Sequence, residues 1–195
     1  KRFVPVELLD VAGLVEEAHL GKGLGSQFLN DLNEADALIH VLDVSGSTNE
    51  KGEAVKPLSY DPLKDIKFIG HELDMWYYQI MKKGWDKFAR TVKQENKNIK
   101  SALEKQLSGL RVTEKMIGDS IKKLNLSHNP TEWNDNELMN LAGELRISSK
   151  PMIIAANKID IGGAEFNFHR LKEVYKNYSI VPCSADAELA LKEAA

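Results

Sequence analysis

An apolar stretch in the last quarter of the chain ends directly in three side chains that suit a purine base. It begins at Pro151 and opens onto Asn157, Lys158 and Asp160, where a strand of a parallel sheet would end. An amide donates and accepts hydrogen bonds, a lysine stem can lie across a ring, and a carboxylate accepts two parallel N–H bonds. Guanine offers such an N–H pair and adenine does not. The pattern predicts a purine site that prefers guanine, with a strand and an ordinary polar loop as the alternative interpretation.

Two further candidate sites also follow predicted strands. Asp10 comes directly after one strand and lies three residues before Gly13. A carboxylate in that place can hold a magnesium ion through water, and a glycine lets its backbone N–H approach a terminal phosphate. Ser184 and Ala185 follow the last predicted strand. Carboxyl ends of parallel strands share one edge of a sheet, so the three loops together favour one site over three unrelated turns.

The positions of these sites depend on the elements that carry them. Apolar runs predict strands, and stretches with apolar residues at three- and four-residue steps predict helices. Strands are expected over residues 3–9, 37–44, 151–157 and 179–183, and helices over 26–33, 134–146, 165–178 and 186–195. Strands alternating with helices predict an α/β fold with a parallel sheet and right-handed crossovers.

The middle of the chain has a different character. Residues 47–60 are polar and are expected to form a linker, whereas 61–124 carry a long helical periodicity. We predict a helical hairpin similar to an antiparallel coiled coil, inserted into the α/β domain. The domain boundaries are then 1–46 with 125–195 for the α/β domain, and 47–124 for the linker and inserted helices.

Composition narrows the class of protein. The 195 residues are 43% hydrophobic and 28% charged, as in a globular protein, and no apolar run approaches the ~20 residues that span a bilayer. Cys183 is the only cysteine, which excludes an intrachain disulfide and suits a reducing, cytoplasmic setting. The five histidines are scattered, so no histidine and cysteine cluster for a metal is expected.

Charge is distributed unevenly. The formal net charge is −3, yet residues 82–123 hold twelve Lys or Arg against five Asp or Glu. This span is therefore basic within an otherwise acidic chain. Basic helices suit contact with a phosphate backbone, so we expect RNA or ribosome binding there, and a solvated helix face is the alternative.

The order of the three sites resembles that of the TRAFAC GTPases. Stretches 9–15, 21–29 and 36–44 look most like the Obg-related branch, and especially the YchF (Obg-like ATPase) family, which also carries an inserted helical domain. The resemblance covers essentially the whole chain. It implies a P-loop NTPase-type parallel sheet flanked by helices. It also implies that the phosphate-binding loop precedes Lys1 in a longer protein, so these 195 residues alone are expected to bind nucleotide poorly and to catalyse nothing.

The same resemblance implies roles for the base-reading residues. Asn157 and Asp160 would hold the base, and Lys158 would pack over it. The Ala185 backbone N–H would donate to the guanine oxygen, with Ser184 supporting its loop.

For the phosphate side, the resemblance implies that Asp10 is linked to Mg2+ through water and that Gly13 senses the terminal phosphate. Leu14 stands where many small GTPases carry a water-orienting glutamine. Since leucine cannot polarise water, hydrolysis is expected to be slow or to depend on another group.

The resulting expectation is a GTP-binding protein with GTP or GDP and Mg2+ as cofactors. It would hydrolyse GTP slowly as a switch in ribosome-related work. Many YchF proteins prefer ATP and have Glu at the position of Asp160, so an ATP-preferring enzyme is one alternative. A non-catalytic module that binds RNA or protein is the other.

Overall fold

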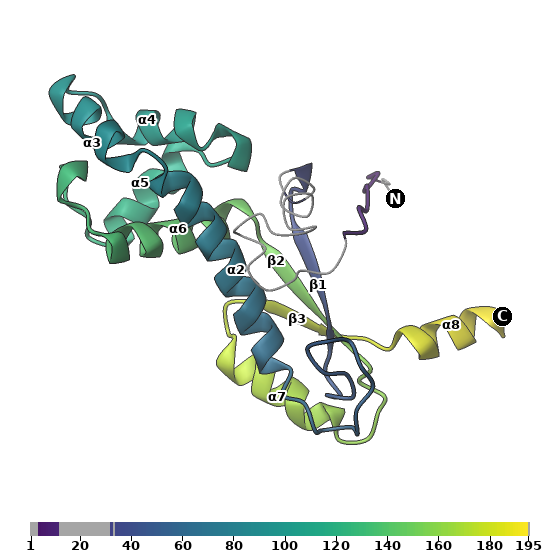
Figure 1. The fold of residues 1–195 in the computed structure, drawn as a ribbon. Coiled ribbons are helices and arrows are strands. Elements are labelled where there is room, and N and C mark those ends of the chain that lie inside the picture. The colour runs from purple at the N-terminus through teal and green to yellow at the C-terminus, as the bar shows by residue number, and fades with distance from the viewer. Residues whose placement is uncertain (1–3, 12–31, 33, 195) are drawn as a thin grey trace. The chain divides into compact units, whose positions relative to one another are not determined.

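The computed structural model describes residues 4–11, 32 and 34–194, and the chain divides into two compact units (Figure 1). The sheet unit comprises Ala37–Gly70 and Met152–Ala195. The helical unit comprises Lys1–Asp36 and His71–Pro151. Helix α2 (Leu63–Lys82) contributes its first turns to the sheet unit and its remainder to the helical unit.

Three parallel strands form the centre of the sheet unit. They are β1 (Leu38–Asp43), β2 (Met152–Asn157) and β3 (Ser179–Pro182), paired in that order. The register aligns the last residues of β1 and β2, which are Asp43 and Asn157. These strands confirm the three apolar runs predicted at 37–44, 151–157 and 179–183, and the parallel α/β class.

One face of the sheet carries the core of this unit. Leu42, Ile154 and Ile180 are buried there with apolar residues of α7 (Ala164–Val174) and of the first turns of α2. The other face keeps apolar side chains exposed: Ile39 is 59% exposed and Val41 is 65% exposed. Strand alternation separates the two sets, because successive side chains point to opposite faces. The last helix, α8 (Ala185–Glu193), follows β3 and has no buried residue.

Residues 47–60, expected to be a linker, belong to a folded loop over 45–60 at the carboxyl end of β1. Backbone hydrogen bonds join Val55 to Ser47, Leu58 to Ser45 and Tyr60 to Gly46. An antiparallel bridge between Thr48 and Ala54 makes the outer part a small hairpin. The loop therefore has a fixed shape beside the predicted base-reading residues.

Gly46 allows this loop to close. Its φ is +61°, and a Cβ at this position would lie 2.2 Å from the carbonyl oxygen of Tyr60. A side chain is therefore excluded both by backbone conformation and by space.

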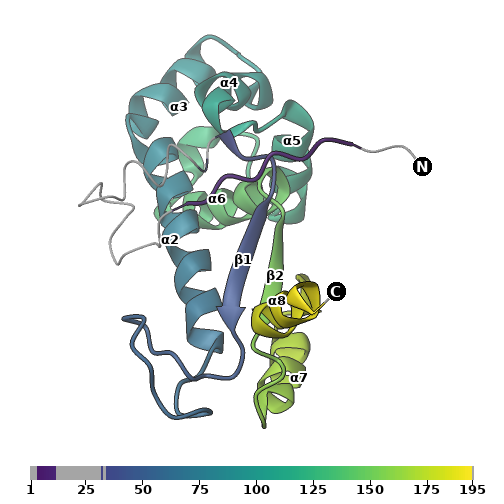
Figure 2. The same ribbon diagram turned by 90° about the vertical axis from the view of Figure 1, so that its right-hand side faces the viewer.

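The helical unit is built mainly from short helices (Figure 2). Buried aromatic and aliphatic side chains form its core. Besides α2, its helices are α3 (Trp85–Gln94), α4 (Ile99–Gln106), α5 (Glu114–Lys123) and α6 (Asp135–Ser149), with 3-10 turns at Ser108–Leu110 and Pro130–Glu132. Trp85 stacks on Trp133 with ring centroids 5.5 Å apart. Helix α6 packs against α5 within this unit.

The predicted coiled-coil hairpin over 61–124 is wrong, because the chain reverses several times within it. Gly84, Asn96 and Arg111 each adopt a positive φ, which ends a helix or a turn. Asn98 and Thr113 then cap the next helices with their side chains. The apolar periodicity was read correctly, but it belongs to successive short helices that pack on one another.

The strand predicted at 3–9 is also not formed in its described part. Residues 4–11 have no strand assignment, and the apolar side chains of Val4, Val6 and Leu8 are exposed. A strand needs a hydrogen-bonded neighbour, and no pairing to residues 4–11 occurs in the described chain. Most of the helix predicted at 26–33 lies outside the described residues.

Helix α6 begins at Asp135, beside the start predicted at residue 134, and a capping box holds this end. The Asn134 side chain accepts from the Glu137 backbone N–H, and the Glu137 carboxylate accepts from the Asn134 N–H. Among the described helices, none combines the length and apolar composition required to cross a bilayer.

Candidate functional site

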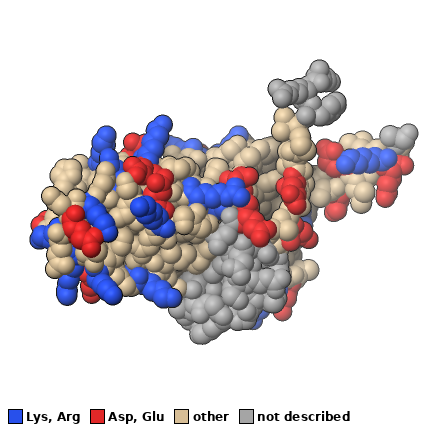
Figure 3. Space-filling view, turned by 90° about the horizontal axis from the view of Figure 1, so that it is seen from above, with Lys and Arg blue, Asp and Glu red and all other residues tan. Residues whose placement is uncertain are grey.

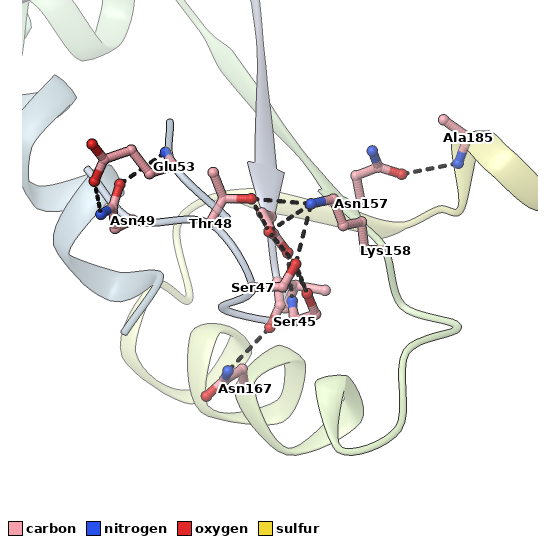
Figure 4. Close-up of polar contacts among 11 residues, drawn as sticks. Ser45, Ser47, Thr48, Asn49, Glu53, Asn157, Lys158, Asn167 and Ala185 are labelled. Atoms are coloured by element: carbon pink, nitrogen blue, oxygen red, sulfur yellow. Dashed lines mark hydrogen bonds and ion pairs between the residues drawn. The ribbon is translucent and has the colours of Figure 1, made fainter. Parts of the chain in front are cut away.

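Two side chains leave the carboxyl end of β2 in different directions (Figure 4). Asn157 reaches toward the loop that follows β3, whereas Lys158 reaches toward the loop that follows β1. Lys158 adopts a φ of +63°, which turns the chain sharply at the strand end. The candidate site therefore draws on the carboxyl ends of the three described strands, with β1 taking part in place of the strand expected before Asp10.

The Asn157 side chain connects the loops after β2 and β3. Its Oδ1 accepts a hydrogen bond of 2.9 Å from the backbone N–H of Ala185. Ser184 caps the following helix by accepting from the N–H of Ala187. The N–H predicted to meet a guanine oxygen is thus engaged by Asn157, and a base would have to share or replace that bond. The Asn157 Nδ2 has no partner among the described residues, so it is available to a ligand.

Asp43, at the end of β1, collects hydrogen bonds from the loop that follows it. Its Oδ1 accepts from the backbone N–H and hydroxyl of Ser45, at 3.0 and 2.6 Å. Its Oδ2 accepts from the hydroxyls of Ser47 and Thr48, at 2.9 and 2.7 Å. The Lys158 ammonium adds a further bond of 2.8 Å to Oδ2. A carboxylate so fully bonded fixes the geometry of the first four residues of the loop.

The surroundings of Asp43 favour its charged form. Burial by itself would raise the pKa of the carboxyl, but the hydrogen bonds from Lys158, Ser45, Thr48 and Ser47 outweigh it and hold the pKa well below its usual range. Asp43 is therefore an anion at every physiological pH.

The Lys158 ammonium is fully engaged within the protein. Besides Asp43, it donates to the hydroxyl oxygens of Ser47 and Thr48, at 3.2 and 3.1 Å. An ammonium has three protons, and each has an acceptor here. What remains for a ligand is the methylene stem.

Asp160 presents an exposed carboxylate at the same edge. Within residues 34–194 its side chain has no hydrogen-bond or ion-pair partner. The loop that carries it is held by backbone hydrogen bonds, from Ile161 to Lys158 and from Ala164 to Ile161. Asp160 is thus an acceptor that a ligand can reach without breaking a protein contact.

Sequence reasoning missed Asp43 and the hydroxyl-bearing loop beside it. The Asp43 and Lys158 side chains meet across 115 positions of sequence. A second long-range bond, from Asn167 Nδ2 to the carbonyl of Val44, ties α7 to the end of β1. The available signal was the run Asp43-Val-Ser-Gly-Ser-Thr48 directly after a buried strand, where acceptor and hydroxyl side chains cluster.

The residues predicted to serve the phosphates are only partly described. Asp10 is exposed and its carboxylate has no partner in the described chain, while Gly13 and Leu14 lie outside the described residues. The described residues include no group of three or more His, Cys, Asp or Glu side chains that could hold a metal ion.

Two models of known protein families match the two ends of the chain. Residues 2–72 match the model described as 50S ribosome-binding GTPase. Residues 155–195 match the model described as Obg-like GTPase YGR210-like, G4 motif-containing domain. The second match includes the loops after β2 and β3.

Individual relatives are similar over nearly the whole chain. An uncharacterised GTP-binding protein of Methanocaldococcus jannaschii is 51% identical over 193 residues, covering 99% of this chain and 48% of the relative. An uncharacterised GTP-binding protein of Schizosaccharomyces pombe is 34% identical over 194 residues, covering 100% of this chain and 47% of the relative. Obg-like ATPase 1 of Homo sapiens is 28% identical over 199 residues, covering 96% and 47%. The chain thus spans about half the length of the curated relatives it matches.

A solved structure supports the same relationship. The crystal structure of a GTP-binding protein from Pyrococcus horikoshii OT3 superposes with a TM-score of 0.77 at 43% sequence identity. The match covers 86% of this chain and 48% of the other.

Proposed function

We propose that this chain, whose ends match family models of Obg-like and 50S ribosome-binding GTPases, is an Obg-like GTPase that binds GTP and GDP and reads the guanine base with the loops after β2 and β3. The observation that carries this proposal is the convergence of Asn157, Lys158, Asp160 and Ala185 at one sheet edge. Asn157 Nδ2 offers a donor, Asp160 offers a free acceptor, and the Lys158 stem offers an apolar surface. These three features match the amide and N–H edge and the ring face of guanine.

Asp160 is the residue on which base preference depends. Its two oxygens would accept the paired N–H groups of guanine, and adenine has no such pair. Losing this charge-assisted pair costs about 1–3 kcal/mol, which is roughly ten- to a hundredfold in affinity. We therefore propose that GTP is preferred over ATP, even though a more distant relative is named an ATPase.

The test is nucleotide affinity in the full-length protein, measured by equilibrium titration with GDP and ADP. Asp160→Ala is expected to weaken the affinity for GDP ten- to a hundredfold and to leave the affinity for ADP nearly unchanged. Glu173→Gln, which removes an exposed carboxylate from α7, is the matched control and should change neither affinity. Tighter binding of ADP than GDP by the parent protein would favour the ATP-preferring alternative.

For the phosphate side, we propose that Asp10 holds Mg2+ through water while Gly13 contacts the terminal phosphate. Leu14 cannot orient a water molecule, so turnover is proposed to be slow without a partner. Replacing Leu14 with Gln tests this in the full-length protein. An unchanged hydrolysis rate would place the limiting step elsewhere.

We further propose that the basic span 82–123 of the helical unit contacts RNA, as on a ribosome. Its twelve Lys and Arg include four in ion pairs. The other eight are exposed and have no ion-pair partner in the described part of the chain: Lys83, Lys87, Arg90, Lys93, Lys100, Lys105, Lys115 and Lys122. Figure 3 shows basic side chains spread over this unit, with acidic ones between them.

A cavity of about 420 Å3 between α4 and α5 adds to this surface. Its lining includes Lys97, Lys100, Lys115, Lys122 and His128, together with Glu114 and Asp119. Lysines around a concave surface suit a phosphate group, and the acids limit how strongly an isolated anion is held.

Binding to an RNA duplex at increasing salt tests this surface. Replacing Lys93, Lys100 and Lys115 with Gln should weaken RNA binding. It should also make the plot of log affinity against log salt concentration less steep, by about two to three units of slope. The control is the same change at Lys51, Lys56 and Lys176, exposed lysines of the sheet unit. Equal losses in both variants would assign the effect to net charge alone.

A further inference from the structure

We propose that Asp43 is the positioning residue for Lys158: it anchors the ammonium at the end of β1, so that the base receives only the methylene stem. This inference rests on the proposed function, since it assigns a task to Lys158 in base reading. It concerns a residue that lies on a different strand and that sequence motifs leave without a role.

The geometry of the anchor supports this assignment. Asp43 and Asn157 are register partners at the ends of adjacent strands, and Lys158 follows Asn157 directly. The lysine stem therefore bridges from the end of β2 to the end of β1, where its ammonium meets Asp43 at 2.8 Å. Ser47 and Thr48 complete the set of acceptors.

Asp43 is itself held in place from its own loop. Its four other hydrogen bonds come from the backbone and side chain of Ser45 and from the hydroxyls of Ser47 and Thr48. The Asp43 side chain is only 14% exposed, whereas that of Lys158 is 36% exposed. The fixed partner is thus the carboxylate, and the lysine is the side chain whose position it determines.

Anchoring has a chemical consequence for the ligand. A free lysine is a flexible point charge that is attracted to phosphate and that loses rotamer freedom when it packs on a ring. A lysine whose three protons are already engaged has lost that freedom before the ligand arrives. Pre-ordering of this kind increases affinity for whatever packs on the stem.

A double-mutant cycle between Asp43 and Lys158 in the full-length protein tests the assignment. Asp43→Asn keeps the shape and weakens the ionic anchor, and Lys158→Met keeps an apolar stem and removes the charge. Each substitution is expected to weaken the binding of GDP about tenfold, and the double variant is expected to bind GDP no more weakly than either single variant.

Inorganic pyrophosphate, which has no base, separates base contact from phosphate contact. It should bind the parent and Asp43→Asn equally, because the anchor serves only the base.

Asn49→Ala is the matched control for loop order. The Asn49 side chain holds the tip of the same loop by hydrogen bonds with Lys51 and Glu53 and makes none with Lys158. The Asn49→Ala variant should bind GDP with the affinity of the parent protein. A loss in Asn49→Ala as large as that in Asp43→Asn would show that loop order alone matters and would overturn the assignment.

The remaining outcomes separate this inference from the proposed function. Additive losses in the Asp43 and Lys158 variants, in a parent protein that binds GDP, would overturn the role of Asp43 and leave guanine binding intact. A parent protein that binds pyrophosphate but neither GDP nor ADP would refute base reading itself, and the anchor with it.

Discussion

Asn157 Oδ1 accepts a hydrogen bond from the backbone N–H of Ala185 at 2.9 Å, so one side chain at the end of β2 reaches the loop that follows β3. The same side chain keeps its Nδ2 free of described protein partners. One amide therefore performs two separable tasks, connecting two loops and offering a donor to a ligand.

Two substitutions separate these tasks. Asn157→Asp retains the acceptor for Ala185 and loses the donor, so the free energy of unfolding should remain within about 0.5 kcal/mol of the parent while GDP affinity falls at least tenfold. Asn157→Ala loses both and should also unfold about 1 kcal/mol more easily. Urea denaturation and GDP titration give the two quantities. If Asn157→Asp bound GDP like the parent, Nδ2 would have no part in base contact.

Gly46 and Gly52 form a matched pair for backbone strain in the loop after β1. Both have a positive φ, of +61° and +77°, but a Cβ at Gly52 would meet nothing within 4 Å. Gly52→Ala should cost about 1 kcal/mol for the left-handed conformation. Gly46→Ala adds the collision with Tyr60 and should cost about 1–3 kcal/mol more. Chemical denaturation of the two variants measures the difference, and equal losses would mean that the loop moves aside freely.

In the helical unit, the buried Arg146 of α6 donates through Nε to Asp74 of α2 at 2.8 Å. Arg146→Met should destabilise the protein by about 2–4 kcal/mol, because it leaves the Asp74 carboxylate partly buried without this partner. Lys123→Met breaks the exposed pair of Lys123 with Glu144 and should cost at most about 1 kcal/mol. Thermal and urea unfolding of both variants measure the two losses of stability. Similar small losses would show that Asp74 is well solvated without Arg146.

His40 should make stability depend on pH. Burial lowers its pKa to about 4, and its Nδ1 is buried without a hydrogen-bond partner in the described chain. The unfolded chain then binds more protons than the folded one between about pH 6.5 and 4. Stability from the neutral imidazole is therefore present above that range and is lost as pH falls through it, at up to about 1.4 kcal/mol per pH unit.

Unfolding measured from pH 7 to 4 checks this prediction. His40→Leu should lose the slope, whereas His169→Gln, at an exposed position of α7, should keep it. The contribution of Asp43 lies at lower pH: its lowered pKa adds stability above the ordinary aspartate value of about 3.9, and this stability is lost as pH falls further. An unchanged slope in His40→Leu would assign the pH dependence to other groups.

The sheet could be predicted from sequence because its signals are local. Each of β1, β2 and β3 is an apolar run that ends in a polar turn, and the capping residues Asn134 and Glu137 mark the start of α6 within four positions. The prediction failed where local pattern and tertiary contact disagree. The 61–124 periodicity is real, but the positive φ of Gly84, Asn96 and Arg111 divides it among successive helices, and periodicity alone does not show such breaks.

The positions of the candidate base-reading residues in the fold were predictable to the same degree. Asn157, Lys158 and Asp160 could be placed at a strand end from the order of residue types alone. The anchoring role of Asp43 could not, since its partner lies 115 positions away and the register that brings them together appears only in the folded sheet. Likewise, the engagement of the Ala185 N–H by Asn157 depends on how two loops meet.

The hairpin closed by the Thr48 and Ala54 bridge has a practical consequence for spectroscopy. Its tip at Lys51 is exposed, and Thr48, at its base, touches the Lys158 ammonium. Cys183 is the only cysteine of these 195 residues, and burial raises the pKa of its thiol, which slows its alkylation. A cysteine introduced at Lys51 would therefore take up a fluorescent dye first. The dye would be attached to the tip of this hairpin. A change in its emission would report the binding of a ligand against the Lys158 stem.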